Sequence, residues 1–246
     1  VLSLSILALL VAVKRIEPRA LLPDWSGLRA SIGKALTHHW LNVALQAPSL
    51  ALPLVVTVVL TAGMTAYFYT ALMIAGMVFI APIALVTTLY AAGSSEPATV
   101  ASKVRFTLAL ASLAGLVAAA LVFVVASPLL RMFGPGYADR GTQSLRYLVL
   151  AVFPLLVKDH YVTICRLRYQ VARAALWVTA GGVLEIVLAG AGGRVDALAG
   201  VSLGYLAGTC IEALFMGRIV LRVAAPDVSL TLPRPSSLLR MLSRAR

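Results

Sequence analysis

Residues 106–126 read FTLALASLAGLVAAALVFVVA and contain no charged side chain. A helix needs about 20 apolar residues to cross the hydrocarbon core of a bilayer, which is about 30 Å thick. This stretch therefore predicts a transmembrane helix. Outward from it, similar stretches recur on both sides, at residues 1–13, 41–62, 66–92, 147–165, 174–192 and 197–217. The first of these is too short to cross a bilayer by itself.

The composition of the whole chain agrees with these stretches. Hydrophobic residues make up 61% of the 246 residues and charged residues only 12%, against about 25% charged residues in average soluble domains. The predicted fold class is all-α, a polytopic transmembrane helix bundle. A formal net charge of +12 would suggest a nucleic-acid partner in a soluble protein. Here the charge lies beside the membrane, so we expect membrane lipids and not nucleic acid as partners.

The basic residues predict the orientation. Sixteen of the 21 lysines and arginines lie in the first, third and fifth gaps between stretches or after the last stretch. Cytoplasmic loops of membrane proteins carry an excess of these two residues. The bias therefore predicts that these gaps and the C-terminus are cytoplasmic. Abundant alanine, together with an excess of arginine over lysine, favours a GC-rich bacterial genome and hence the bacterial inner membrane.

The connections predict the domain organisation. In residues 14–40, Leu28, Ile32 and Leu36 recur at helical spacing and predict an amphipathic helix on the membrane surface. An unstructured linker is the alternative, because two prolines interrupt the first part. The expected regions are a transmembrane helix cut by the start of the chain at 1–13, a cytoplasmic connection at 14–40, a six-helix transmembrane lobe at 41–221 and a basic cytoplasmic tail at 222–246.

Ionisable residues inside the stretches are the first candidates for a site. At 1.5 Å per residue, Lys158 lies about 12 Å, Glu212 about 9 Å and Glu185 about 18 Å from the cytoplasmic boundary. Such groups cost a few kcal/mol each in a bilayer, so they usually face a cavity or a partner. One interpretation is a polar path through the bundle. The other is that Lys158 reaches the cytoplasmic surface and pairs structurally with Glu212.

The stretch at 41–62 adds polar candidates. Asn42, Gln46, Pro48 and Pro53 fall within twelve residues, and prolines leave backbone carbonyls that protein or water must satisfy. This pattern predicts a cavity wall, with hydrogen bonds to a neighbouring helix as the alternative. The predicted cavity residues are Asn42, Gln46, Lys158, Asp159, Glu185 and Glu212.

Catalytic and cofactor motifs are missing from the sequence. It contains no Walker motif, no GxSxG, no HExxH and no paired cysteines at metal-ligand spacing. We therefore expect no enzyme activity, no catalytic residue, no cofactor and no metal site. Gly200, Gly204 and Gly208 form a small-xxx-small repeat, which predicts close helix packing. In the gap after Pro128, Gly134 and its neighbours predict a solvated turn.

Three stretches together carry a resemblance to a known family. They are HHWLNVALQAPSLALPLVV at 38–56, AYFYTALMIAGMVFIAPIALVTTLYA at 66–91, and PLLRMFGPGY at 128–137 leading into SLRYLVLAVFPLL. From about Thr37 to Leu221 the chain resembles the C-terminal half of bacterial polysaccharide flippases of the MOP superfamily, which are relatives of the MATE exporters and lipid II flippases.

The resemblance implies two six-helix lobes that rock about a substrate cavity to give alternating access. It implies a preceding N-terminal lobe of the same protein, and an undecaprenyl-pyrophosphate-linked oligosaccharide as the substrate. Such a substrate calls for cationic groups, and this lobe offers only Lys158 beside Asp159, so the other lobe supplies them or the substrate differs. Glu185 and Glu212 leave open an ion-coupled exporter of small molecules with the same fold. A membrane-embedded polysaccharide-modifying enzyme and a scaffold lobe are further alternatives.

Overall fold

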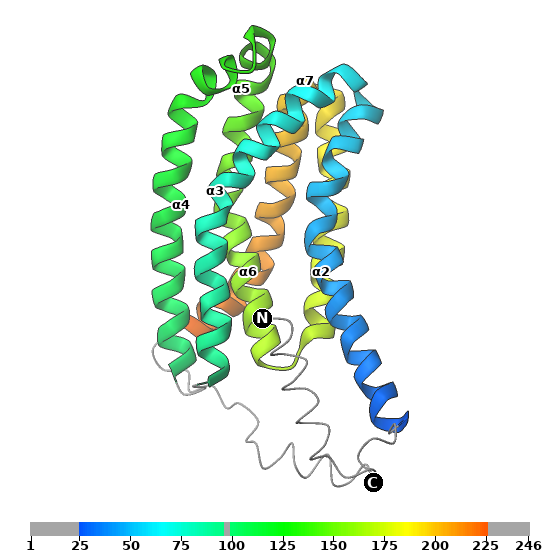
Figure 1. The fold of residues 1–246 in the computed structure, drawn as a ribbon, viewed down its shortest axis with the longest axis vertical. Helices are drawn as coiled ribbons and strands as arrows, with labels where there is room; N and C mark the ends of the chain where they lie inside the picture. The colour runs from blue at the N-terminus through cyan, green and yellow to red at the C-terminus, as the bar shows by residue number, and fades with distance from the viewer. Residues whose placement is uncertain (1–24, 96–98, 226–246) are drawn as a thin grey trace, which may run out of the picture. The chain divides into compact units, whose positions relative to one another are not determined.

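The computed structural model describes residues 25–95 and 99–225, and within them it is helical without strands. The expected segment at 1–13 and the tail from residue 226 lie outside the described residues. Figure 1 shows the helices, and their bounds are α2 Trp25–Val59, α3 Ala62–Ser95, α4 Val100–Arg131, α5 Pro135–Leu150, α6 Val152–Leu167 and α7 Val171–Ala224. The prediction of an all-α fold is confirmed.

Five helical segments in the described part of the chain are long and apolar enough to cross a membrane. They are Ser31–Val59, Ala62–Leu89, Val100–Arg131, Pro135–Leu167 and Val171–Ala224. Many of their large apolar side chains are exposed, such as Val58, Leu121 and Leu214, which suits a lipid environment. The chain is therefore a multi-pass membrane protein.

Helix α7 consists of two arms that run in opposite directions. Its 54 residues would extend about 81 Å at 1.5 Å per residue, far more than one bilayer crossing needs. The backbone leaves the helical conformation at Asp196 and Ala197, where φ of Ala197 is 41°. The two arms match the separate stretches predicted at 174–192 and 197–217.

Glycines form the contact between the two arms. A Cβ added to Gly200 would collide with the backbone of Gly192, and one added to Gly204 would collide with the backbone of Leu188. Along the second arm, successive glycines contact residues that lie progressively earlier in the first arm, so the two arms are antiparallel. The packing role predicted for the glycine repeat is confirmed.

The gap predicted after Pro128 is shorter than expected. Helix α4 continues through Pro128 to Arg131, and α5 starts at Pro135. The turn at 132–134, with φ of 127° at Gly134, is the non-helical part, and Asp139 and Arg140 just after it are exposed, so the predicted turn and its solvated charges are present on a shorter connection. The helix forms because Pro135 is suited to a first helical turn and because Leu145 and Leu148 give α5 a buried face.

The connection before the first described crossing also differs from the expected boundary. The segment predicted as an amphipathic helix is helical, but α2 continues from Trp25 to Val59 without an end near residue 40. Within residues 40–225, the junctions between helices alternate between two ends of the bundle (Figure 1). The α2–α3 and α4–α5 junctions and the turn in α7 lie at one end, and the α6–α7 junction lies at the other.

Candidate functional site

Lys158 forms ion pairs with two glutamates inside the bundle. Its Nζ atom lies 2.6 Å from Oε1 of Glu185 and 2.5 Å from Oε2 of Glu212. Lys158 comes from α6, and the glutamates come from the two arms of α7. The residues are 3%, 0% and 5% exposed, respectively. The lysine therefore does not reach the surface, and the predicted pair with Glu212 is present as part of a triad that also includes Glu185.

The two arms of α7 hold their glutamates in the same way. Each arm carries a glycine four residues before its glutamate, in GGVLE at 181–185 and GTCIE at 208–212. A Cβ added to Gly208 would lie 2.7 Å from the Cα of Glu185, and one added to Gly181 would overlap the carboxyl group of Glu212. Each glutamate thus fits against the glycine of the opposite arm.

The triad carries one more negative than positive group when all three members are ionised. Three of its carboxylate oxygens, Oε2 of Glu185 and both oxygens of Glu212, are buried without a hydrogen-bond partner. Of these, Oε2 of Glu212 forms the ion pair with Lys158. Removing charges from water costs several kcal/mol per ion unless partners compensate for the lost hydration. The ammonium of Lys158 compensates one carboxylate fully, and the second carboxylate is left in excess.

The neighbouring residues of α6 add a second polar region. Asp159 is half-buried and lies within the electrostatic influence of both Lys158 and Arg166. The Nδ1 atom of His160 donates a hydrogen bond to the carbonyl of Leu156 at 2.8 Å. Its Nε2 atom lies 3.2 Å from the hydroxyl of Thr107 on α4. His160 is fully buried, so these two contacts fix its ring.

The structure does not bring the two predicted polar residues of α2 to the triad. Asn42 and Gln46 are both exposed. The Oδ1 atom of Asn42 accepts a hydrogen bond of 2.7 Å from Nη2 of Arg166. This contact matches the alternative interpretation, in which an amide of this stretch bonds to a neighbouring helix.

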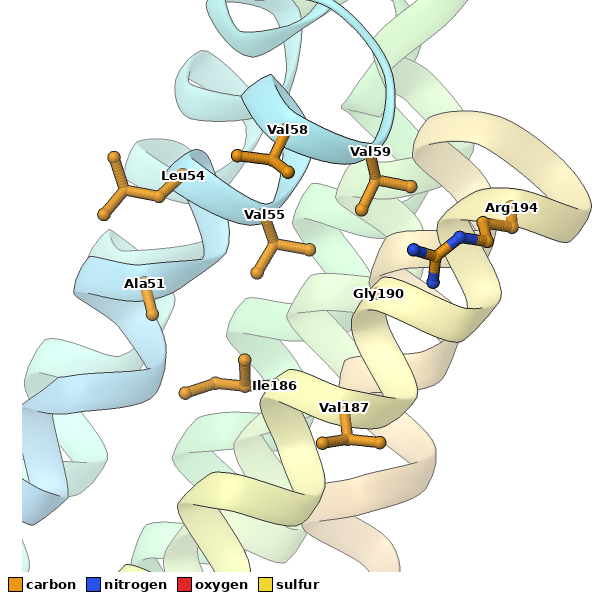
Figure 2. Close-up of a pocket in the computed structure, with 9 residues that line it drawn as sticks. All are labelled: Ala51, Leu54, Val55, Val58, Val59, Ile186, Val187, Gly190 and Arg194. Carbon is orange, nitrogen blue, oxygen red and sulfur yellow. The ribbon is translucent and has the colours of Figure 1, made fainter.

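A separate apolar groove lies between α2 and the first arm of α7. It has a volume of about 440 Å³ and contains none of the predicted site residues. Figure 2 shows Arg194 at one end, and its guanidinium is the only charged group in the lining. The lining residues are Ala51, Leu54, Val55, Val58, Val59, Ile186, Val187, Gly190 and Arg194.

Sequence reasoning missed the part that Gly181 and Gly208 play in the site. The repeated spacing, glycine followed four residues later by glutamate, was the available signal. Residues four apart lie on one face of a helix, so on each arm this spacing puts a glycine, which has no side chain to fill the space beside it, next to a carboxylate. When two such arms are antiparallel, the glutamate of each arm can occupy the space beside the glycine of the other arm.

Comparison of the chain with protein-family models, with curated proteins and with solved structures finds no significant match.

Proposed function

We propose that the chain is one lobe of a membrane transporter that moves a lipid-linked oligosaccharide across the bacterial inner membrane by alternating access. The observation that supports transport is the buried triad of Lys158, Glu185 and Glu212. Charged groups within membrane-crossing helices are costly and mark substrate or ion pathways. A bundle that served only as a scaffold would be at least as stable with apolar residues at these positions.

The lipid-linked oligosaccharide follows from the resemblance to polysaccharide flippases. The crossings support it, because α2, α3, α4, the α5–α6 pair and the two arms of α7 give the six crossings that one lobe of such a transporter has. In this proposal Lys158 does not bind the pyrophosphate, since two carboxylates already neutralise it. The cations for the headgroup would come from the other lobe.

The triad also favours a second candidate function. Ion-coupled exporters of small molecules with the same fold need acidic residues in the membrane, and Glu185 and Glu212 meet this need. The two candidates differ in substrate and share the alternating-access mechanism.

The proposal can be tested by measuring surface polysaccharide in cells that depend on the full-length protein. We expect Lys158→Ala and Glu185→Gln to reduce surface polysaccharide strongly and to leave lipid-linked oligosaccharide on the cytoplasmic leaflet. Asp196→Asn, at an exposed position outside the triad, serves as the matched control and should export normally. Unchanged export by both triad variants at normal expression would refute the proposed site. Normal export combined with lost resistance to cationic dyes would favour the exporter.

A further inference from the structure

We propose that the Lys158–Glu185–Glu212 triad binds one exchangeable proton, shared by the two carboxyl groups, and that this proton couples transport to the proton gradient. The second part rests on the proposed function, whereas the first does not. The starting observation is the charge of the triad. With one ammonium and two carboxylates it carries one unit of negative charge, and none of its members is more than 5% exposed.

A proton removes the excess charge. Two carboxylates that share a buried site cannot both ionise without a large penalty, and one of them then keeps its proton. Both oxygens that face Lys158 lie within 2.6 Å of its Nζ atom, so the two carboxyl groups adjoin each other. The neutral form of the triad contains one ammonium, one carboxylate and one carboxylic acid. The unpartnered Oε2 of Glu185 and Oε1 of Glu212 are free to carry the proton.

The other titratable groups near the triad do not supply the missing positive charge. The hydroxyl of Tyr205 lies on the second arm of α7 and is within the electrostatic influence of both glutamates and of Asp159. Asp159 adds negative charge, and Arg166 on the same helix acts against it. The ring of His160 is bound to Leu156 and Thr107. None of these neighbouring groups therefore neutralises the excess negative charge of the triad, and a proton bound by the triad itself has to do so.

The position of Lys158 also determines which kind of cation the triad can bind. Metal cations such as calcium require six or more oxygen ligands around the ion. The ammonium of Lys158 stands at 2.6 Å or less from both carboxyl groups, which is the position that a metal ion would need. A proton needs only a lone pair on one carboxylate oxygen, so the triad favours a proton over a metal ion.

Release of the proton is a simple step. When the transporter admits water to the triad, the O–H bond of the carboxylic acid breaks and its electron pair stays on the carboxylate oxygen. The proton passes to water, and the triad changes from neutral to one negative charge. Closing the site again requires a proton, because burial of the net charge is unfavourable. Opening to opposite sides of the membrane would then carry one proton per cycle.

Infrared spectroscopy of the protein in lipid bilayers can count protonated carboxyl groups through their carbonyl band. We expect the wild-type protein to have one such group in the triad. Glu185→Gln and Glu212→Gln should each lose the band, because lysine and the remaining glutamate form a neutral pair. Lys158→Met should double it, because both glutamates must then be neutral. The control Asp196→Asn should match the wild type.

Several results would overturn the proposal. A wild-type band that persists at full strength in Glu212→Gln would place the proton elsewhere, and loss of the band in Asp159→Asn would assign it to that residue. If Lys158→Met fails to fold, the glutamate variants still decide the proton count. For the coupling, Glu212→Gln in proteoliposomes should transport at a rate that no longer responds to a pH gradient. A gradient response equal to that of the wild type would refute coupling, whether or not the substrate is an oligosaccharide.

Discussion

The contact between the arms of α7 offers a direct test of the fold through Gly204→Ala. A Cβ at this position would lie 2.9 Å from the amide nitrogen of Ala189 and closer still to the carbonyl of Leu188. Non-bonded carbon atoms prefer separations of about 3.5–4.0 Å. The obstructing atoms belong to the backbone, so no side-chain rotation relieves the collision and the arms must move apart.

The magnitude follows from two opposing effects. Alanine is favoured over glycine in a helix by about 1 kcal/mol. Overpacking of a tight contact costs about 1–3 kcal/mol, and a collision with backbone belongs at the upper end. We therefore expect Gly204→Ala to lower the free energy of unfolding by about 1–2 kcal/mol, which is a factor of roughly 5–30 in the equilibrium constant.

Gly76→Ala is the matched control for this experiment. Gly76 lies within α3, and an added Cβ there has no neighbour within 4 Å. Only the gain in helix propensity applies, so this variant should be at least as stable as the wild type. Unfolding in mixed lipid–detergent micelles, followed by helical circular dichroism, measures both variants. Equal stability of Gly204→Ala and Gly76→Ala would refute the close antiparallel packing of the two arms.

Three further predictions concern the triad and the topology. Gly181→Ala should push the carboxyl group of Glu212 away from Lys158 and reduce transport, whereas a transport rate equal to that of the wild type would contradict the fit. Lys158→Met should lower the free energy of unfolding by about 3–5 kcal/mol at neutral pH. This loss should shrink as the pH falls, because the folded variant must protonate both glutamates whereas the folded wild type protonates one, so a lower pH stabilises the variant more than the wild type. A pH-independent loss in denaturation experiments would argue against it. In a cysteine-free background, Asp196→Cys should react with an impermeant reagent from outside the cell and Arg173→Cys only from the cytoplasm; the reverse pattern would invert the predicted orientation.

The sequence predicted the crossings well because their signal is local. An uninterrupted apolar stretch such as residues 106–126 needs no knowledge of its neighbours to be identified as a membrane helix. The helical course through residues 135–150 was missed because that segment is amphipathic and contains charges. Its hydrophobic face is recognised only when the neighbouring helices that cover it are known.

The candidate site was predicted in part. Matching depths along two stretches suggested that Lys158 and Glu212 could meet, and they do. Glu185 was placed deeper, because counting residues ignores the length of a lysine side chain and the tilt of each helix. Asn42 and Gln46 were grouped with the triad on polarity alone. Only the three-dimensional arrangement shows that their side chains are exposed.

The reciprocal fit of glutamate and glycine in α7 limits how the protein can move. A slide of one arm past the other by a single residue, about 1.5 Å, would drive Glu185 and Glu212 out of their glycine recesses at the same time. The two arms of α7 are therefore expected to move together as one rigid unit and not to slide past each other. A motion that opens the triad to water and keeps this fit would move α6, with Lys158, relative to the two arms of α7.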